Sequence, residues 1–275
     1  MLNRTFCHLH GISTRREKSL WHHGVERWDD FADPRHLDEL EKSRQAIADD
    51  DAAFFASRLA SKERWRIFPT FRHRTAYLDI ETTGFAADTN KVTSIALYDG
   101  EQILYYVQGE NLDDFIRDIA SYQQIVTYNG TGFDIPFLER TLGCRFPQAH
   151  LDLRYILAAL GLRGGLKGCE HQLGLDRGDL EGVDGYFAVL LWQEYQRSGD
   201  PKARETLLAY NIEDVVNLET LMVIAYNRHL AATPFADETL SLPERPEIPF
   251  TPHLPLIEKL RRERGTDDTS FFRLR

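Results

Sequence analysis

Three short segments contain residue types that could together hydrolyse a phosphate ester. Asp79 and Glu81 lie two positions apart at the end of an apolar run, Asp134 follows a glycine-rich stretch, and Tyr210 and Asp214 lie four positions apart. Hydrolysis of a phosphodiester needs a hydroxide nucleophile and a stabilised leaving oxygen, and two divalent metals about 4 Å apart supply both. Hard cations prefer carboxylate oxygens as ligands. The four acids therefore predict a site for two divalent metal ions, Mg²⁺ or Mn²⁺.

The elements expected around these residues would bring the acids together. Residues 75–80 predict a buried strand, and residues two apart in a strand share one face, so Asp79 and Glu81 would point the same way. Residues 203–228 predict a long helix, on which Tyr210 and the acid four positions later share one face. Acids crowded in this way repel one another when no metal is bound, which predicts raised pKa values.

The other elements expected in the middle of the chain indicate the fold class. Asp134 is expected to cap a helix over residues 134–142. Strands are expected over residues 92–98, 102–107 and 124–128, and helices over residues 112–121, 153–160, 166–173 and 185–197. This order predicts an α/β fold whose mixed sheet has three antiparallel strands plus parallel strands and is flanked by helices.

The order and spacing of the acidic segments resemble a known family. The segments Asp79–Gly84, Asn129–Asp134 and Tyr210–Asp214 resemble those of the DEDDy 3′–5′ exonucleases, in the DnaQ-like branch of the ribonuclease-H-like superfamily. The resemblance implies a ribonuclease-H-like fold and a two-metal 3′–5′ exonuclease acting on single-stranded ends of DNA or RNA. The related DEDDh branch has histidine where this chain has Tyr210.

The resemblance also implies a role for each residue. Asp79, Glu81 and Asp214 would hold the metal that activates water, Asp79 would bridge to the second metal, and Asp134 would act on that metal largely through water. Tyr210 would hydrogen-bond the attacking water, and a phenol with a pKa of about 10 orients water better than it deprotonates it.

Substrate contacts are expected beside the acids. In the resembling family, backbone amides matching Thr82, Thr83 and Gly84 hold the terminal nucleotide, and residues matching Asn129 and Phe133 line its path. The aromatic residues near the site could stack bases, although most of them are expected in the core; they are Phe85, Tyr128, Phe133, Tyr186 and Phe187.

A narrower resemblance joins the chain to the bacterial YprB-type ribonuclease-H-like proteins, which are predicted exonucleases. It covers about residues 70–228 and rests on residues 151–154, 166–170, 184–189 and 191–192. Asp152 and Asp184 could form an outer shell of the metal site, but helix N-capping is the favoured interpretation. Lys167 could neutralise a phosphate, but a solvent-facing lysine is favoured.

Composition divides the chain into three regions. Residues 1–70 are rich in charge and histidine and predict a small helical N-terminal module, followed by the catalytic domain over residues 71–230. Residues 231–275 hold six of the eleven prolines, which predicts an extended C-terminal tail. Its apolar residues favour a tail that wraps the domain, and a short helix is expected over residues 256–264.

The N-terminal module allows two interpretations. Residues 10–31 resemble a helix-hairpin-helix motif, in which backbone amides contact a DNA phosphate and Arg15, Arg16 and Lys18 would add contacts. Ser13 replaces the usual second glycine of the hairpin, so a packing module is an equal alternative. A zinc site is disfavoured because one cysteine and scattered histidines do not give four ligands at zinc spacing; they are Cys7, His8, His10, His22 and His23.

Charge and composition limit the remaining possibilities. The net charge is −10, yet residues 1–75 hold 14 basic and 12 acidic residues, so a nucleic-acid partner is permitted without strong nonspecific binding. Three cysteines far apart, with no apolar stretch of signal or membrane length, predict a cytoplasmic protein. Three alternatives stay open: a nucleic-acid-binding module with negligible turnover, a proofreading or repair nuclease subunit that needs a partner, and an endonuclease on structured junctions with the same metal chemistry. The complete set of acids favours the enzyme.

Overall fold

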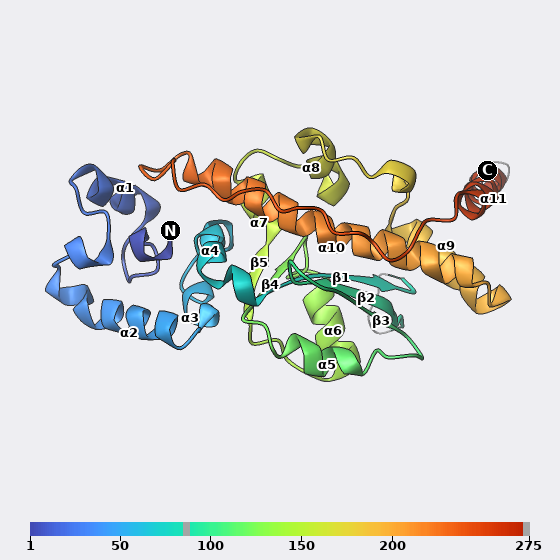
Figure 1. Ribbon diagram of the computed structural model, residues 1–275, viewed down its shortest axis with the longest axis horizontal. Coiled ribbons are helices and arrows are strands. Elements are labelled where there is room, and N and C mark those ends of the chain that lie inside the picture. The colour runs from blue at the N-terminus through green and yellow to red at the C-terminus, as the bar shows by residue number, and fades with distance from the viewer. Residues whose placement is uncertain (85–88, 272–275) are drawn as a thin grey trace.

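A five-stranded mixed sheet forms the centre of the molecule, in the order β3-β2-β1-β4-β5 (Figure 1). The computed structural model describes residues 1–84 and 89–271. The strands are β1 (Thr75–Thr82), β2 (Val92–Tyr98), β3 (Ile103–Val107), β4 (Gln124–Thr127) and β5 (Ala149–Asp152). β1, β2 and β3 are antiparallel, and β4 and β5 continue the sheet in parallel from β1. The predicted mixed sheet is confirmed, although β5 was not predicted.

Alternation along β1 decides which side chains face which layer. Ala76, Leu78 and Ile80 pack in an apolar cluster on the face covered by α5 (Asp114–Ile119) and α6 (Asp134–Leu142) (Figure 1). Tyr77 belongs to a separate cluster on the opposite face. Asp79 and Glu81 have the same parity as Tyr77, so they also leave β1 toward that opposite face.

One long helix, α10 (Pro201–Leu230), covers that face and runs the length of the sheet (Figure 1). Asp200 caps it and Pro201 occupies its first turn, where proline is tolerated. Three shorter helices lie on the same side of the sheet: α7 (Leu153–Ala158), α8 (Gly165–Leu173) and α9 (Gly185–Ser198). All four helices match the ranges predicted from the sequence within a few residues.

The N-terminal segment is helical, as predicted, but its pieces are short. They are η1 (Leu2–Arg4), α1 (Thr14–His22), η2 (Trp28–Asp30), η3 (Pro34–His36), α2 (Leu37–Ala48), α3 (Ala52–Ala56), η4 (Ser61–Arg66), α4 (Phe68–Phe71) and η5 (Arg72–Arg74), where η marks a 3₁₀ helix. The residues before Gly11 form η1 and turns, and not the first α-helix that a helix-hairpin-helix contains.

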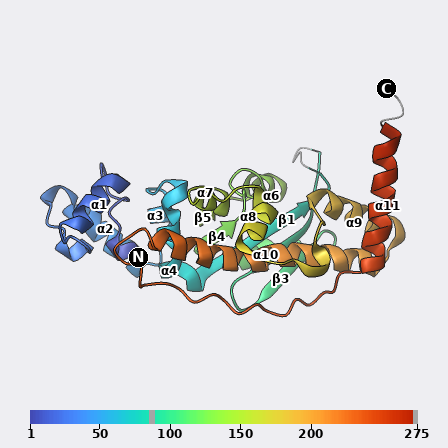
Figure 2. The same ribbon diagram turned by 90° about the horizontal axis from the view of Figure 1, so that it is seen from above.

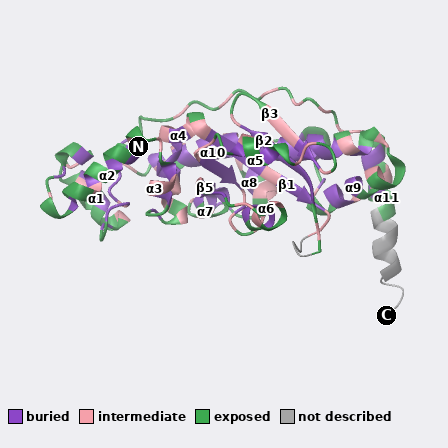
Figure 3. Cartoon of the chain, turned by 90° about the horizontal axis from the view of Figure 1, so that it is seen from below, coloured by how far each residue is buried: buried purple, intermediate pink, exposed green. Residues whose placement is uncertain are grey.

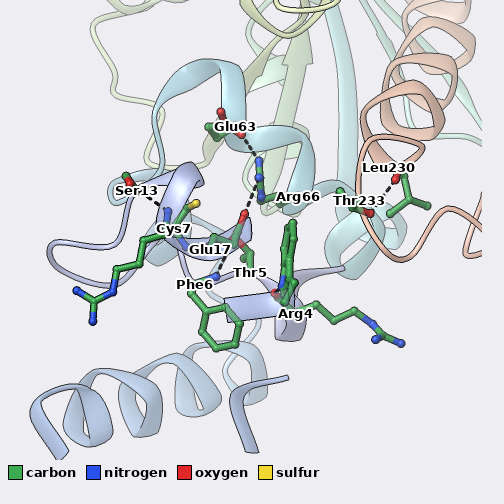
Figure 4. A network of polar contacts seen from close by, with 12 residues as sticks. Arg4, Thr5, Phe6, Cys7, Ser13, Glu17, Glu63, Arg66, Leu230 and Thr233 are labelled. Atoms are coloured by element: carbon green, nitrogen blue, oxygen red, sulfur yellow. Dashed lines mark hydrogen bonds and ion pairs between the residues drawn. The ribbon is translucent and has the colours of Figure 1, made fainter. Parts of the chain in front are cut away.

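A buried charge network ties α1 and the residues before it to η4, within this segment (Figure 4). Glu17 of α1 is fully buried and accepts hydrogen bonds from the Thr5 hydroxyl at 2.5 Å and the Phe6 amide at 2.7 Å. Its second oxygen accepts from the Arg66 guanidinium at 2.9 Å, and Arg66 also donates to Glu63. Apolar residues of the segment belong to the same buried cluster as α10, so the N-terminal segment shares one core with the sheet.

The C-terminal segment folds back along α10 (Figure 2). We call residues 238–253 the strap. Leu240 exchanges two backbone hydrogen bonds of 2.8 Å with the Asn227 side chain, and the His253 amide donates to the Thr206 hydroxyl at 3.0 Å. The strap therefore runs antiparallel to α10, which matches the wrapping expected for the tail. It leads into α11 (Leu254–Phe271), a longer helix than the one predicted over residues 256–264.

Burial follows this layering, with the sheet and the inner side of α10 buried and the strap largely exposed (Figure 3). A 3₁₀ helix, η6 (Gly178–Leu180), connects α8 to α9. Within the described part of the chain, no helix has both the length and the hydrophobicity that crossing a membrane requires.

Candidate metal centre

The strand β1 presents two of the predicted acids to α10. Asp79 lies opposite Ala96 of β2 and Glu81 lies opposite Ser94, both small residues. Small neighbours on this face leave room for the helix to approach the acids. The strand extends to Thr82, two residues beyond its predicted end, so both acids lie within it.

The helix α10 contributes the third acid of the cluster. Single ligand oxygens of Asp79, Glu81 and Asp214 all lie within 4.8 Å of one another, and this is the one such group that the described residues contain. Asn211 fixes one of these acids, because its amide donates to Asp79 Oδ2 at 2.7 Å while its own oxygen accepts from the Ser94 hydroxyl at 2.9 Å. No role was predicted for Asn211, although it lies inside the acidic segment.

Asp134 lies beside this cluster rather than within it. Its Oδ1 accepts a hydrogen bond of 3.3 Å from the amide of Ile80, the residue between the two strand acids. The predicted helix capping is wrong in detail, because Phe133 is the N-cap of α6 and Asp134 is its first helical residue. A place beside the strand fits an acid that reaches a bound ion through water.

Burial and mutual repulsion disfavour ionisation of these acids. Burial, followed by repulsion from Asp214, raises the pKa values of Asp79 and Glu81 well above their ordinary ranges. Burial raises the pKa of Asp134 to about 7 and also raises that of Asp214, against the lowering effect of the neighbouring Arg177. Converging buried carboxylates with raised pKa values fit a divalent cation, which would supply the missing positive charge.

Tyr210 shares its face of α10 with Asp214, as predicted, and it has a basic partner. Lys167 of α8 donates to the phenol oxygen at 3.0 Å and also to the Val183 carbonyl. Burial, followed by the charge of Asp214, raises the Tyr210 pKa, so the phenol stays protonated. Lys167 is half-buried, which makes the favoured solvent-facing interpretation wrong. It lies against the tyrosine ring, with Nζ 4.6 Å from the ring centroid.

Arg177, which the sequence did not single out, donates to Asp214 Oδ1. The same guanidinium makes two hydrogen bonds to Glu170, of 2.6 Å from Nε and 3.0 Å from Nη2. Local sequence carries no signal for this contact, because Arg177 lies in a loop far from Asp214 along the chain.

The comparison with protein-family models agrees with this fold. A family model described as the RNase_H superfamily matches residues 76–226. The chain belongs to this superfamily. Among solved structures, it is similar to the family B DNA polymerase from the hyperthermophilic archaeon Pyrobaculum calidifontis, with 19% sequence identity and a TM-score of 0.43. That similarity covers 57% of this chain and 24% of the polymerase chain, so the chain spans about a quarter of that protein's length. No curated protein matches the chain.

One loop of the RNase_H-superfamily domain carries the residues predicted to line the substrate path. Asn129 has a left-handed backbone, with φ 65°, and its amide donates to Asp152 Oδ1 at 2.7 Å. The Thr131 amide and hydroxyl donate to the other oxygen of Asp152, which also caps α7 through the Arg154 amide. Asp152 is therefore the predicted N-cap and also the residue that holds this loop. The other predicted cap, Asp184, accepts from the Phe187 amide at the start of α9.

The turn after β1 is built partly by the residues predicted to bind the terminal nucleotide. The Thr83 amide donates to the Lys91 carbonyl at 2.9 Å, so this amide is used within the hairpin. The Thr82 hydroxyl donates to the Gly84 carbonyl at 2.7 Å, which fixes the shape of the turn.

The aromatic residues that were predicted near the metal centre are partly buried in the core and partly exposed. Phe187 is fully buried, and Tyr128 is half-buried beside Cys169. Phe133 packs against Phe137, with 5.6 Å between ring centroids. Tyr186 is 48% exposed, and Phe85 lies outside the described residues.

Proposed function

We propose that the protein is a metal-dependent 3′–5′ exonuclease of the DEDDy type that hydrolyses single-stranded ends of DNA or RNA. The observation that carries this proposal is the convergence of Asp79, Glu81 and Asp214 oxygens within 4.8 Å, from a strand and a helix far apart in the sequence. Membership of the RNase_H superfamily supports it. The direction of digestion and the similarity to YprB-type proteins rest on the sequence resemblance described above.

The acids would hold two divalent ions, Mg²⁺ or Mn²⁺. Asp79, Glu81 and Asp214 offer direct ligands, and Asp134 would act through water from its place beside β1. When bound, the ions would activate a water molecule and stabilise the leaving oxygen. The protein's own contribution is orientation, since Ser94 and Asn211 hold Asp79 in one position.

Tyr210 would orient the reacting water rather than deprotonate it. The raised pKa keeps the phenol neutral, and the hydrogen bond from Lys167 occupies one lone pair of its oxygen. The phenol then keeps its proton and its other lone pair for a water molecule on the side of the acids. Tyrosine at this position is what assigns the chain to the DEDDy group.

The loop held by Asp152 and the turn after β1 would contact the terminal nucleotide. Asn129 and Phe133 lie on the loop, and Thr82, Thr83 and Gly84 lie on the turn. Residues 1–70 would support the catalytic domain through the shared core rather than bind DNA independently, and the Glu17–Arg66 ion pair would hold the module itself together (Figure 4).

The test is cleavage of 5′-labelled single-stranded DNA and RNA with Mn²⁺ or Mg²⁺ by the wild type, by Asp79→Asn and by Asp113→Asn. Asp113 is an exposed acid at the start of α5, on the other face of the sheet, and serves as the matched control. We expect a metal-dependent ladder that shortens from the 3′ end with the wild type and the control, and none with Asp79→Asn. Cleavage by Asp79→Asn, or no cleavage of either nucleic acid by the folded wild type, would contradict the proposal.

A further inference from the structure

Arg177 lies between an acid of the candidate metal centre and a second, fully buried acid. Its guanidinium makes two hydrogen bonds to Glu170, of 2.6 and 3.0 Å, and also donates to Asp214 Oδ1. The Arg177 side chain is 3% exposed and that of Glu170 is 1% exposed. Such a guanidinium is planar and cannot turn toward Asp214 independently of its bonds to Glu170.

Glu170 is itself held from α10 and, beyond it, from the strap. Asn217 donates to Glu170 Oε1 at 2.9 Å and to Glu213 Oε1 at 3.2 Å. Arg245 of the strap donates to Glu213 and, at 3.2 Å, to the Asn217 oxygen. A continuous set of hydrogen bonds therefore runs from the surface strap to Asp214.

Asp214 needs such a partner because the other acids repel it. Glu81 and Asp79 point at it from β1 within 4.8 Å, and repulsion would turn an unrestrained carboxylate away from them. A guanidinium that donates to Asp214 Oδ1 attracts the carboxylate and so restricts its rotation against this repulsion. Glu170 balances the guanidinium charge, so the clamp adds no net positive charge that would oppose a metal ion.

We propose that Arg177 is a positioning residue that, held by Glu170, fixes the Asp214 carboxylate for metal binding. This inference rests on the metal centre of the proposed function, but it concerns metal affinity and not cleavage. Removing a partner that orients a metal ligand typically lowers the metal affinity by about 10- to 100-fold.

The N-terminal charge network provides a matched control for the loss of stability that follows when a buried arginine ion pair is disturbed (Figure 4). Arg66 is also a buried arginine between two acids, bonded to Glu17 at 2.9 Å and to Glu63. Its side chain is 5% exposed, close to the value for Arg177. Replacing either arginine by lysine keeps the charge, loses the fork geometry and disturbs a buried ion pair, but only Arg177 contacts an acid of the metal centre.

The experiment compares Mn²⁺ binding by calorimetry in the wild type, Arg177→Lys and Arg66→Lys, with the thermal midpoint of each metal-free protein measured in parallel. We expect both variants to lower the midpoint, and only Arg177→Lys to weaken Mn²⁺ binding, by about 10- to 100-fold. Wild-type affinity in Arg177→Lys, or equal weakening in Arg66→Lys, would overturn the inference.

A second variant covers the case in which Arg177→Lys does not fold. Glu170→Gln keeps the shape of the Arg177 partner but removes its charge, and we expect it to weaken Mn²⁺ binding by about 10-fold. Unchanged affinity in Glu170→Gln would overturn the inference. If the wild type binds Mn²⁺ and these variants bind it weakly, but no nucleic acid is cleaved, the proposed function fails and the role of Arg177 stands. A wild type that binds no Mn²⁺ overturns the inference.

Discussion

Replacing Asp79 by asparagine should stabilise the metal-free protein, even though it should abolish activity. The ligand oxygens of Asp79, Glu81 and Asp214 lie within 4.8 Å of one another. Two ionised carboxylates at that separation repel by about 3.5 kcal/mol at an effective dielectric constant near 20. Partial protonation and the 2.7 Å hydrogen bond from Asn211 to Asp79 relieve some of this repulsion. We therefore expect the free energy of unfolding to rise by about 2 kcal/mol at pH 8, or roughly 4–8 °C in thermal midpoint.

The sign of this effect depends on pH in a defined way. Burial and then repulsion from Asp214 raise the Asp79 pKa in the folded state, whereas an unfolded aspartate titrates at about 4. Because the unfolded chain releases the proton at lower pH, the wild type loses stability as pH rises above about 4. In Asp79→Asn the side chain at position 79 does not titrate, so it contributes no such decrease in stability as pH rises. The difference between the two proteins should be near zero at pH 4 and grow toward pH 8.

Urea unfolding in EDTA at several pH values between 4 and 8 measures this difference, with Asp113→Asn as a surface control. Excess Mn²⁺ should then reverse the order at pH 8, because an ion that binds the folded wild type stabilises it by mass action. An Asp79→Asn protein no more stable than the wild type at pH 8, or a difference that does not change with pH, would refute the reasoning.

Three further outcomes are expected. Tyr210→Phe should lower kcat by about 10- to 100-fold in a steady-state cleavage assay while the thermal midpoint stays within a few degrees, and an unchanged kcat would exclude the orienting role. Asp152→Ala should lower the free energy of unfolding by about 2–4 kcal/mol in urea titrations, since it removes a helix cap and the hydrogen bonds that hold the 129–131 loop. Phe235→Ala should lower the free energy of unfolding by about 3–5 kcal/mol in the same titrations. The Phe235 ring is buried, with its centroid 5.4 Å from that of Trp21 and 4.1 Å from Arg4 Cζ. A decrease below about 1 kcal/mol would mean that this contact does not hold the N-terminal segment.

Periodicity predicted most of the fold because local pattern and tertiary burial agree in this chain. Along β1, Ala76, Leu78 and Ile80 fill one apolar cluster, and the alternation that buries them also directs Asp79 and Glu81 to the other face. The predicted ranges of β2 and α6 match the structure. The spacing of Tyr210 and Asp214 placed both residues on one face of α10.

The contacts that complete the candidate site could not be predicted from local pattern. Arg177 lies 37 positions from Asp214 and reaches it only because the chain folds the loop before η6 against α10. Lys167 was expected to face solvent, because the sequence around a single lysine on a helix does not indicate that Tyr210 of α10 packs against it. The strand β5 has only two apolar residues, Ala149 and Leu151, which leaves too weak a pattern to recognise.

The strap imposes an order on completion of the site during synthesis. Every acid of the candidate centre precedes Arg245, which follows its partner Glu213 by 32 positions. A nascent chain that has released α10 can pair the sheet and bury its core, but Glu213 then has no arginine partner until the strap emerges. This late contact of the growing chain is thus connected, through Asn217 and Glu170, to Arg177 and Asp214. A chain cut short within the strap would fold around its acids yet leave Glu213 and Asn217, the outer anchors of that connection, without Arg245.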